Sequence, residues 1–130
     1  MSTKVMIVDD DKFLLNMYAL KFKANGFDID TACGGAEAID KLKAGSKPDI
    51  LITDLIMPKM DGFAFVEEIK KSGLAEQATI IVLTNQGQSS DIDKAVALGV
   101  DGYIVKATTI PSEVVEEVKN IFLKKTQSAK

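Results

Sequence analysis

Histidine is absent from this chain of 130 residues, and Cys33 is its only cysteine. Without histidine the protein has neither an imidazole for acid–base catalysis nor the commonest metal ligand, so a bound metal must be a hard cation held by oxygen atoms. A single cysteine excludes an internal disulfide and is typical of a reducing compartment. We expect Cys33 to be a small apolar filler.

A surplus of basic residues and a long apolar run are also missing. Lys and Arg total 16 against 19 for Asp and Glu, which gives a formal net charge of -3 and argues against direct binding of nucleic acid. No apolar run approaches the roughly 20 residues that span a bilayer, and the first residues lack the apolar segment of a signal peptide. We therefore expect a cytoplasmic protein without membrane insertion.

Internal repeats and low-complexity tracts are missing as well. A chain of 130 residues that is 46% apolar suits one compact domain. We expect this domain to occupy residues 1–130, with a core at residues 4–124 and a short polar C-terminal tail.

Strand-like and helix-like segments alternate along the chain. Apolar or alternating runs predict five strands, at residues 4–8, 28–32, 49–53, 79–83 and 102–105. The segment 28–32 alternates polar with apolar residues, so it should lie at an edge of the sheet. Five strands separated by helices predict an α/β fold with a parallel sheet, right-handed crossovers and helices on both faces.

Apolar residues at helical spacing predict five helices between and after these strands. We expect their buried stripes to be, in chain order, Phe13, Met17, Leu20 and Ala24; Gly35, Ala38, Ile39 and Leu42; Gly62, Phe65, Val66 and Ile69; Ile92, Ala95 and Val96; and Val114, Val118 and Ile121. Asn25-Gly26 should stop the first helix, and Asp61 should cap the third.

Polar residues follow the strands at one edge of the sheet, because the carboxyl ends of parallel strands point the same way. These residues are Asp9, Asp10, Asp54, Thr84 and Lys106. Crowded carboxylates repel one another unless a divalent cation lies among them, and Mg²⁺ prefers a few carboxylates and water. Mg²⁺ can bridge a carboxylate to a phosphoryl oxygen, while Thr84 can donate a hydrogen bond and Lys106 can supply charge to other oxygens.

Each of these residues alone has an ordinary structural explanation. Asp54 or Thr84 can begin a turn. Asp10 or Asp11 can cap the first helix, and Lys106 can be a solvated strand end. Their coincidence at one edge favours a site for phosphate and metal.

The sequence resembles the receiver domains of response regulators in two-component signalling, the family of the chemotaxis regulator, over nearly its whole length. The resemblance is carried by Val8-Asp9-Asp10-Asp11, Asp54, Met57-Pro58, Met60-Asp61-Gly62, Thr84 and Lys106, in the family's order and spacing. It implies a flavodoxin-like, doubly wound fold with strand order 2-1-3-4-5. It leaves open whether the chain is a free-standing regulator or a receiver from a longer protein.

By this resemblance, Asp54 is the phosphoacceptor and the nucleophile of a phosphoryl transfer. Asp9, Asp10 and Asp54 would hold Mg²⁺ together with the backbone carbonyl of Ile56. Because the chain has no histidine, a phosphohistidine donor must belong to a partner histidine kinase or phosphotransfer protein. The protein would catalyse its own phosphorylation and slow dephosphorylation without being a conventional enzyme.

The same resemblance assigns Thr84 and Lys106 to binding of the phosphoryl group. Tyr103 matches the aromatic residue that turns inward when Thr84 is drawn to the phosphate. Phosphorylation adds about one to two negative charges, which would bias a two-state arrangement of loop and helix. The surface of the fourth helix, fifth strand and fifth helix would then bind a downstream protein target.

Two positions depart from the family's pattern. Ala107 follows Lys106 where the family usually has proline, so the bond between them is predicted to be trans, because a cis bond there would cost about 2.5 to 4 kcal/mol. Asn85 follows Thr84 where the family prefers a small residue, and it either restricts entry to the phosphate site or forms a hydrogen bond within its loop.

Two further residues are predicted to set the lifetime of the phosphorylated state. Ile56 and Gln86, two positions after Asp54 and Thr84, flank the approach of the hydrolytic water by resemblance. Ile56 offers no hydrogen bond, and Gln86 can orient a water molecule without being a strong base. The phosphorylated state should therefore persist.

Three other functions are weaker interpretations of the same residues. A phosphate-ester hydrolase that uses a strand-terminal aspartate would need a second acid two residues on, where Ile56 stands. A flavin-binding module would need a phosphate-cradling loop where Asp9-Asp10-Asp11 repel phosphate. A receiver that no longer accepts phosphate would have lost part of the acid cluster, which is complete here.

Overall fold

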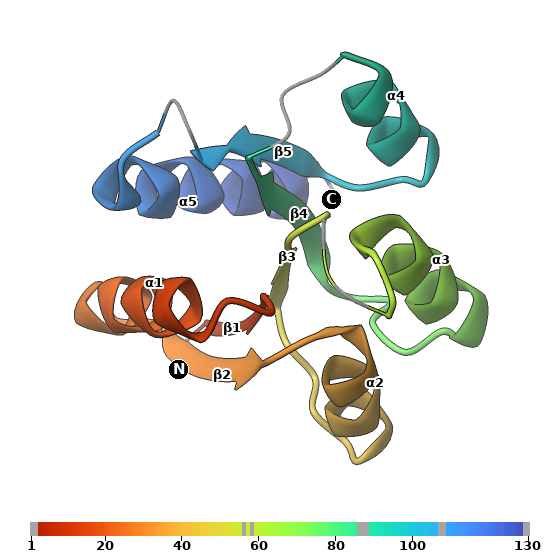
Figure 1. Ribbon diagram of the computed structural model, residues 1–130. Helices are drawn as coiled ribbons and strands as arrows, with labels where there is room; N and C mark the ends of the chain where they lie inside the picture. Colours follow the sequence, from red (N-terminus) through yellow and green to blue (C-terminus); the bar gives the residue numbers. More distant parts are fainter. Residues whose placement is uncertain (1–2, 56, 58, 86–88, 107–108, 129–130) are drawn as a thin grey trace.

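The computed structural model describes residues 3–55, 57, 59–85, 89–106 and 109–128. Within these residues the strands are β1 (Lys4–Val8), β2 (Asp28–Ala32), β3 (Ile50–Thr53), β4 (Thr79–Thr84) and β5 (Gly102–Val105). The helices, which alternate with the strands (Figure 1), are α1 (Lys12–Ala24), α2 (Gly35–Lys43), α3 (Gly62–Ser72), α4 (Ser89–Ala97) and α5 (Pro111–Ser128).

The strands form one parallel sheet in the order β2-β1-β3-β4-β5, which confirms the predicted topology and the edge position of β2. The register aligns Val8 with Thr53, Thr53 with Val82, and Val82 with Tyr103, so these four residues form one row across the sheet. Residues that follow this row on β1 and β3 therefore leave the sheet side by side.

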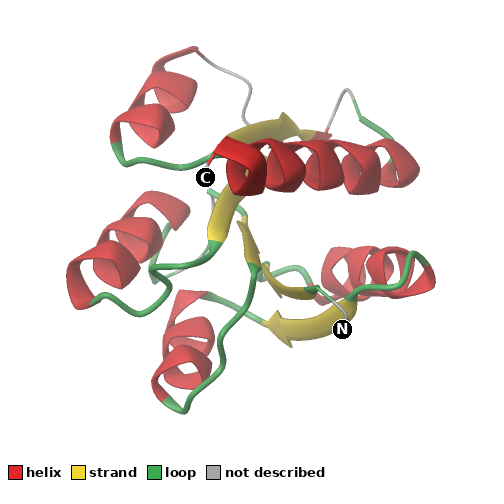
Figure 2. Ribbon diagram, turned by 180° about the vertical axis from the view of Figure 1, so that it is seen from behind, coloured by secondary structure: helices red, strands yellow, loops and turns green. Residues whose placement is uncertain are grey.

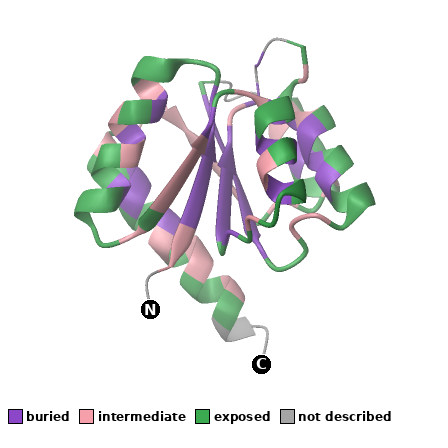
Figure 3. Cartoon of the chain, turned by 90° about the horizontal axis from the view of Figure 1, so that it is seen from below, coloured by how far each residue is buried: buried purple, intermediate pink, exposed green. Residues whose placement is uncertain are grey.

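Helices cover both faces of the sheet. In Figure 1, α1 and α5 lie together on one face and α2, α3 and α4 on the other, and the opposite view in Figure 2 shows the same layers. The strands between the layers are mostly buried (Figure 3). β3 and β4 are buried along their whole length, as their continuous apolar runs indicate. None of the described helices has the length and apolar character that a membrane crossing requires.

The core under α1 and α5 is built from alternate residues of the strands, because successive side chains of a strand point to opposite faces. Its buried members are Val5, Ile7, Leu15, Tyr18, Phe22, Ile50, Ile52, Ile81, Leu83, Ile104, Val114, Val115 and Val118. The predicted stripe of α5 is confirmed, since Val114 and Val118 are buried and Ile121 packs against them.

The predicted face of α1 is wrong. Phe13 and Leu20 are 77% and 69% exposed, Ala24 is exposed, and Met17 is only partly buried. The buried side chains of α1 are those of Leu15, Tyr18 and Phe22. Apolar residues surround nearly the whole of α1, so two different stripes have helical spacing. The stripe with two large aromatic rings buries more area, and it is the one that packs on the sheet.

The predicted stripes of α2 and α3 are confirmed, because every residue named for them is buried. α4 differs from the prediction. Ala95 is buried and Ile92 is partly buried, but Val96 is 62% exposed. Adjacent residues on an α-helix lie about 100° apart, so Ala95 and Val96 do not face the same surface.

The ends of the helices follow the predicted chemistry. Asp61 caps α3, since its Oδ1 accepts a hydrogen bond from the Ala64 N–H at 2.8 Å. Gly73 ends α3 with a φ of 67°, and Gly26 follows α1 with a φ of 89°, left-handed values that glycine adopts without strain. α5 continues to Ser128, so most of the predicted tail after residue 124 is helical.

Candidate functional site

The alternation of side chains along the strands places the acids at one edge of the sheet. Ile7 and Ile52 both belong to the core under α1 and α5. Asp9 and Asp54 lie two residues further along the chain, so they continue to the same side of the sheet, just beyond its last apolar row. Two carboxylates thus cover the end of the apolar core.

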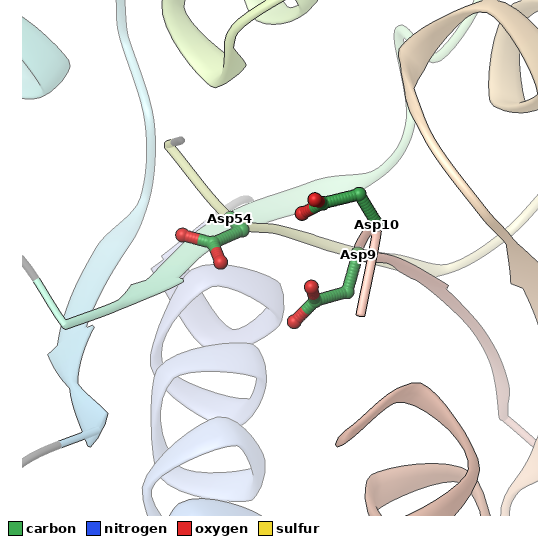
Figure 4. A group of neighbouring side chains, drawn as sticks. All are labelled: Asp9, Asp10 and Asp54. Atoms are coloured by element: carbon green, nitrogen blue, oxygen red, sulfur yellow. The ribbon is translucent and has the colours of Figure 1, made fainter. Parts of the chain in front are cut away.

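Asp9, Asp10 and Asp54 form an acidic cluster, in which each offers a carboxylate oxygen within 4.8 Å of the others. Figure 4 shows the three side chains next to one another, following β1 and β3. Asp9 is 4% exposed, Asp54 is partly buried, and Asp10 is exposed. The predicted cluster is therefore assembled, with Asp10 on its solvent side.

Lys106 reaches the acidic cluster from the end of β5. Its Nζ donates to Asp9 Oδ2 at 2.8 Å and to Asp54 Oδ2 at 3.1 Å, and its side chain is 6% exposed. Burial lowers the pKa of Lys106, but hydrogen bonds and charges from Asp9 and Asp54 outweigh burial and raise that pKa above its ordinary 10.5. Lys106 is therefore a fixed positive charge shared by two carboxylates.

Burial dominates the ionisation of Asp9. It raises the pKa of Asp9 above the ordinary 3.8, although hydrogen bonds from Lys106 and from the Asp11 N–H act in the opposite direction. Between 3.8 and the raised pKa, the folded protein holds a proton at Asp9 that the unfolded chain has released. Asp9 therefore makes the free energy of unfolding decrease as pH rises through that interval.

We expect Asp9→Asn to remove this part of the pH dependence, because asparagine does not titrate. Relative to wild type, the free energy of unfolding of Asp9→Asn should increase as pH rises from the ordinary pKa of an aspartate and should then become constant. Urea unfolding without divalent cations, from about pH 4 to about pH 7, measures this difference. A difference that is the same at every pH would contradict the assignment.

Backbone contacts fix the position of Asp54. Its N–H donates to the Val8 carbonyl at 3.2 Å, its Oδ1 accepts from the Leu55 N–H at 2.7 Å, and its carbonyl accepts from the Thr53 hydroxyl at 3.0 Å. Gly62, the first residue of α3, packs so closely that an added Cβ would lie 2.2 Å from the Asp54 carbonyl oxygen. A larger residue at position 62 would displace the backbone of Asp54.

A cleft of about 290 Å³ opens over the acidic cluster. It is lined by Asp9, Asp10, Asp11, Leu14, Asp54, Thr84, Asn85 and Lys106. Thr84 is buried as the last residue of β4, and Asn85 is exposed. The five polar residues that were expected at this edge are therefore brought to one cleft.

Leu14 and Asp11 also line the cleft, and the sequence reasoning assigned neither to the site. Asp11 Oδ1 accepts from the N–H groups of Phe13 and Leu14 at 3.0 and 3.2 Å, which makes Asp11 the cap of α1. The capping signal was visible in the sequence, and it anchors the first turn of α1 beside the acids. Because Leu14 belongs to this turn, its side chain forms an apolar part of the cleft wall.

Tyr103 lies on β5, in the row of Val82. It is partly buried and packs against a small cluster under α4 whose buried members are Leu55, Val82 and Ala95. The backbone of Leu55 also contacts Asp54. Tyr103 is thus connected to the acid-bearing loop through one layer of apolar side chains.

Three expectations fall outside the described residues. These are the backbone carbonyl of Ile56 as a metal ligand, Ile56 and Gln86 as determinants of lifetime, and the trans bond between Lys106 and Ala107. They stay predictions.

Cys33 does not fill the apolar interior, and that prediction is wrong. Its side chain is exposed, and its Sγ donates to the Asp10 carbonyl at 3.6 Å. Cys33 follows the end of β2, so it is beyond the sheet and next to the loop after β1. Ala32 is the buried residue of β2, and the chain leaves the sheet after it, so Cys33 does not reach the core.

The donor set fits Mg²⁺. Opposite ligands of an octahedral Mg²⁺ lie about 4.2 Å apart, since each bond is about 2.1 Å long. The oxygens of the acidic cluster lie within 4.8 Å of one another, so a single ion among them is within reach of all three carboxylates. Both described ion pairs of the cluster involve Lys106, so three carboxylates share one cation and a divalent ion would reduce their repulsion.

Strand order β2-β1-β3-β4-β5, with helices on both faces, defines a flavodoxin-like doubly wound domain with its polar cleft at the carboxyl edge of the sheet. Residues 5–119 match the family model described as the response regulator receiver domain. The chain therefore belongs to the receiver domain family of two-component response regulators, whose general role is that of a phosphorylation switch.

Known relatives agree with this assignment. The chemotaxis protein CheY of Bacillus subtilis is 37% identical over 107 residues, which cover 82% of this chain and 87% of that protein. The transcriptional regulatory protein PhoP of alkaline phosphatase synthesis, also from Bacillus subtilis, is 31% identical over 93% of this chain but over 49% of its own length. The chain spans about half the length of such transcriptional regulators.

Solved structures give the same fold. Chemotaxis protein CheY4 of Vibrio cholerae superposes with a TM-score of 0.86 at 26% identity, covering 93% of this chain and 99% of that one. A CheY-like receiver domain protein from Methanospirillum hungatei superposes with a TM-score of 0.88 at 21% identity, a likeness of fold alone, over 98% of this chain and 99% of that one.

Proposed function

We propose that this chain is a phosphorylation-activated switch in which Asp54 accepts a phosphoryl group from a partner histidine kinase or phosphotransfer protein. The observation that carries the proposal is the position of Asp54, whose partly buried carboxylate lies at a cleft between the other acids and Lys106. In the transfer, the bond from phosphorus to the donor's nitrogen breaks as a bond to an Asp54 carboxylate oxygen forms.

Asp9, Asp10 and Asp54 would hold Mg²⁺, with the Ile56 backbone carbonyl as a further proposed ligand. When bound, Mg²⁺ supplies positive charge that neutralises the carboxylates and the developing charge of the phosphoryl group. Lys106, whose buried side chain contacts both Asp9 and Asp54, would supply a second positive charge to the phosphoryl oxygens. Thr84 would donate its hydroxyl to a phosphoryl oxygen at the end of β4.

The proposed response to phosphorylation passes through Thr84 and Tyr103. Movement of Thr84 toward the phosphoryl group would open room for Tyr103, which packs in the small cluster under α4. The changed surface of α4, β5 and α5 would then bind a downstream protein target. Ile56 and Gln86 would hold the hydrolytic water poorly, so that the signal persists.

The outer face of α1 supports a protein as the phosphoryl donor. Phe13 and Leu20 are strongly exposed, and with the partly buried Met17 they form an apolar stripe at helical spacing. The stripe begins beside the cleft, because Leu14, the neighbour of Phe13, is part of the cleft wall. A donor protein that brings its phosphohistidine to Asp54 would cover Phe13.

The test is phosphorylation of the purified protein with a small phosphodonor and Mg²⁺, followed by mass spectrometry that maps the modified residue. The proposal requires a phosphoryl group on Asp54 and dependence of the yield on Mg²⁺. Modification of another carboxylate, or equal yield in the presence of a chelator, would reject it.

We expect Phe13→Ser to slow transfer from a phosphorylated donor protein by about tenfold, because removal of a central apolar contact typically costs about 1 to 2 kcal/mol. Phosphorylation by a small phosphodonor should be unchanged, since a small molecule does not need this surface. Transfer of label from a phosphotransfer protein that phosphorylates the wild type measures the first rate.

Val96→Ser on α4 is the matched control for Phe13→Ser. Val96 is an apolar side chain of comparable exposure, 62% against 77%, and it does not line the cleft. It should leave both transfer rates unchanged. Equal slowing by the two variants would indicate a general effect on the protein and would remove the docking role of α1.

A further inference from the structure

The cleft over Asp54 contains more carboxylates than hydrogen-bond donors. Among its described lining residues, four are aspartates, and the side chains that can donate a hydrogen bond are those of Thr84, Asn85 and Lys106. Lys106 already donates to Asp9 and Asp54. An approaching phosphoryl group carries negative charge on three oxygens, so each further donor in this cleft reduces the repulsion that it meets.

Asn85 is the donor at the mouth of the cleft. It follows Thr84, which is 1% exposed, and is itself exposed, so the chain passes from the interior to solvent between these two residues. Among the described residues, the Asn85 side chain has no hydrogen-bond partner. Asn85 lines the cleft and is exposed, so a ligand in the cleft can reach its carboxamide.

We propose that Asn85 is an additional phosphoryl ligand, whose carboxamide N–H donates to an oxygen of the incoming phosphoryl group. The inference depends on the proposed function, because it places the new contact on a group bound for Asp54. A neutral carboxamide suits this position, since it donates a hydrogen bond without pairing permanently with the aspartates as a second lysine would. Asn85 would thus speed phosphorylation of Asp54.

If the Asn85 side chain instead obstructs entry to the cleft, its removal should change the rate of phosphorylation in the opposite direction. Asn85→Ala removes both the carboxamide and most of the side-chain volume. If Asn85 is a ligand, Asn85→Ala reacts about three to ten times more slowly with phosphoramidate at saturating Mg²⁺, the range that one hydrogen bond supports. If Asn85 is an obstacle, the same variant reacts faster.

Asn85→Asp separates charge from size. Aspartate has nearly the volume of asparagine but replaces the donor by a carboxylate, which repels the phosphoryl group. It should therefore react more slowly than Asn85→Ala. Mg²⁺ affinity, measured by calorimetry, should be unchanged in Asn85→Ala, whereas a general structural defect would lower it.

The experiment compares single-turnover phosphorylation by phosphoramidate in wild type, Asn85→Ala, Asn85→Asp and Asp54→Ala, with the label mapped in each. The proposal is supported if the rate of phosphorylation decreases from wild type to Asn85→Ala and decreases further in Asn85→Asp. Equal or faster reaction of Asn85→Ala, with wild type labelled at Asp54, overturns the role of Asn85 alone. If the wild type carries no label on Asp54, or if the Asp54→Ala variant is still labelled, the proposed function is overturned together with this inference.

Discussion

Asp54→Ala is expected to fold like the wild type and to accept no phosphoryl group. Alanine has no side-chain oxygen, so the nucleophile of the proposed transfer is lost completely. The fold should survive because Asp54 lies beyond the last residue of β3, outside the apolar core, and because Lys106 keeps its 2.8 Å contact with Asp9. Incubation with a radiolabelled small phosphodonor and Mg²⁺ measures the uptake, and circular dichroism checks the fold.

Asp54→Asn sharpens this comparison. Asparagine keeps an oxygen that can accept the hydrogen bond that the Leu55 N–H gives to Oδ1 at 2.7 Å, but a neutral amide is a very poor nucleophile. Both variants should be unlabelled. Asp40→Ala, which removes one exposed acid of α2, should be labelled like the wild type. Normal uptake by either Asp54 variant would move the acceptor to another residue.

Asp10→Ala is expected to weaken Mg²⁺ binding by more than about tenfold. Substitution of a residue that only contacts a metal ligand already costs about tenfold or more in affinity, and Asp10→Ala removes a ligand itself. The variant loses one ligand and one negative charge from a cluster of three carboxylates. Because Asp10 is the exposed member of the cluster, its removal should disturb the core little. Calorimetric titration with Mg²⁺ gives the affinity directly.

The stability of the protein provides a second measure of the same site. Mg²⁺ that binds only the folded state raises the free energy of unfolding in proportion to the logarithm of its concentration. This increase should be much smaller for Asp10→Ala than for wild type at the same Mg²⁺ concentration. Asp40→Ala again controls for the change in net charge, and equal Mg²⁺ affinity of Asp10→Ala and wild type would show that the metal binds elsewhere.

The sequence was sufficient for the sheet and for the edge where the acids meet. A run such as Ile50–Thr53 is apolar at every position, so its burial on both faces does not depend on a choice of face. Parallel strands then bring the residues after them to one edge. Asp9 and Asp54 are correctly placed by this argument, which needs no knowledge of side-chain packing.

Helix orientation was less predictable. α1 has apolar residues on several sides, so helical spacing predicts Phe13 and Leu20 as core residues although both are exposed. In α4, the same spacing predicts that Val96 is buried together with its neighbour Ala95, but only Ala95 is buried. Where helical spacing permits two faces, the choice depends on the volumes that fit against the sheet, and this information lies in other segments of the chain.

Parts of the candidate site also depend on distant segments. Lys106 contacts both Asp9 and Asp54, and this requires β5 and β1 to be placed on either side of β3 and β4. The contact of Gly62 with the carbonyl of Asp54 requires the turn that precedes α3. Residue spacing predicted that these residues are near one another, but it did not give the contacts between them.

The small cluster under α4 has a consequence for the order in which parts of the protein open. Ala95 is the buried residue among the described side chains of α4, whereas α1 buries Leu15, Tyr18 and Phe22. Few buried contacts give a low free energy of local opening, so α4 can separate from the sheet while the central strands stay folded. The proposed phosphorylation of Asp54 would therefore have to redistribute only a few kcal/mol to move α4, about the range that separates neighbouring native states.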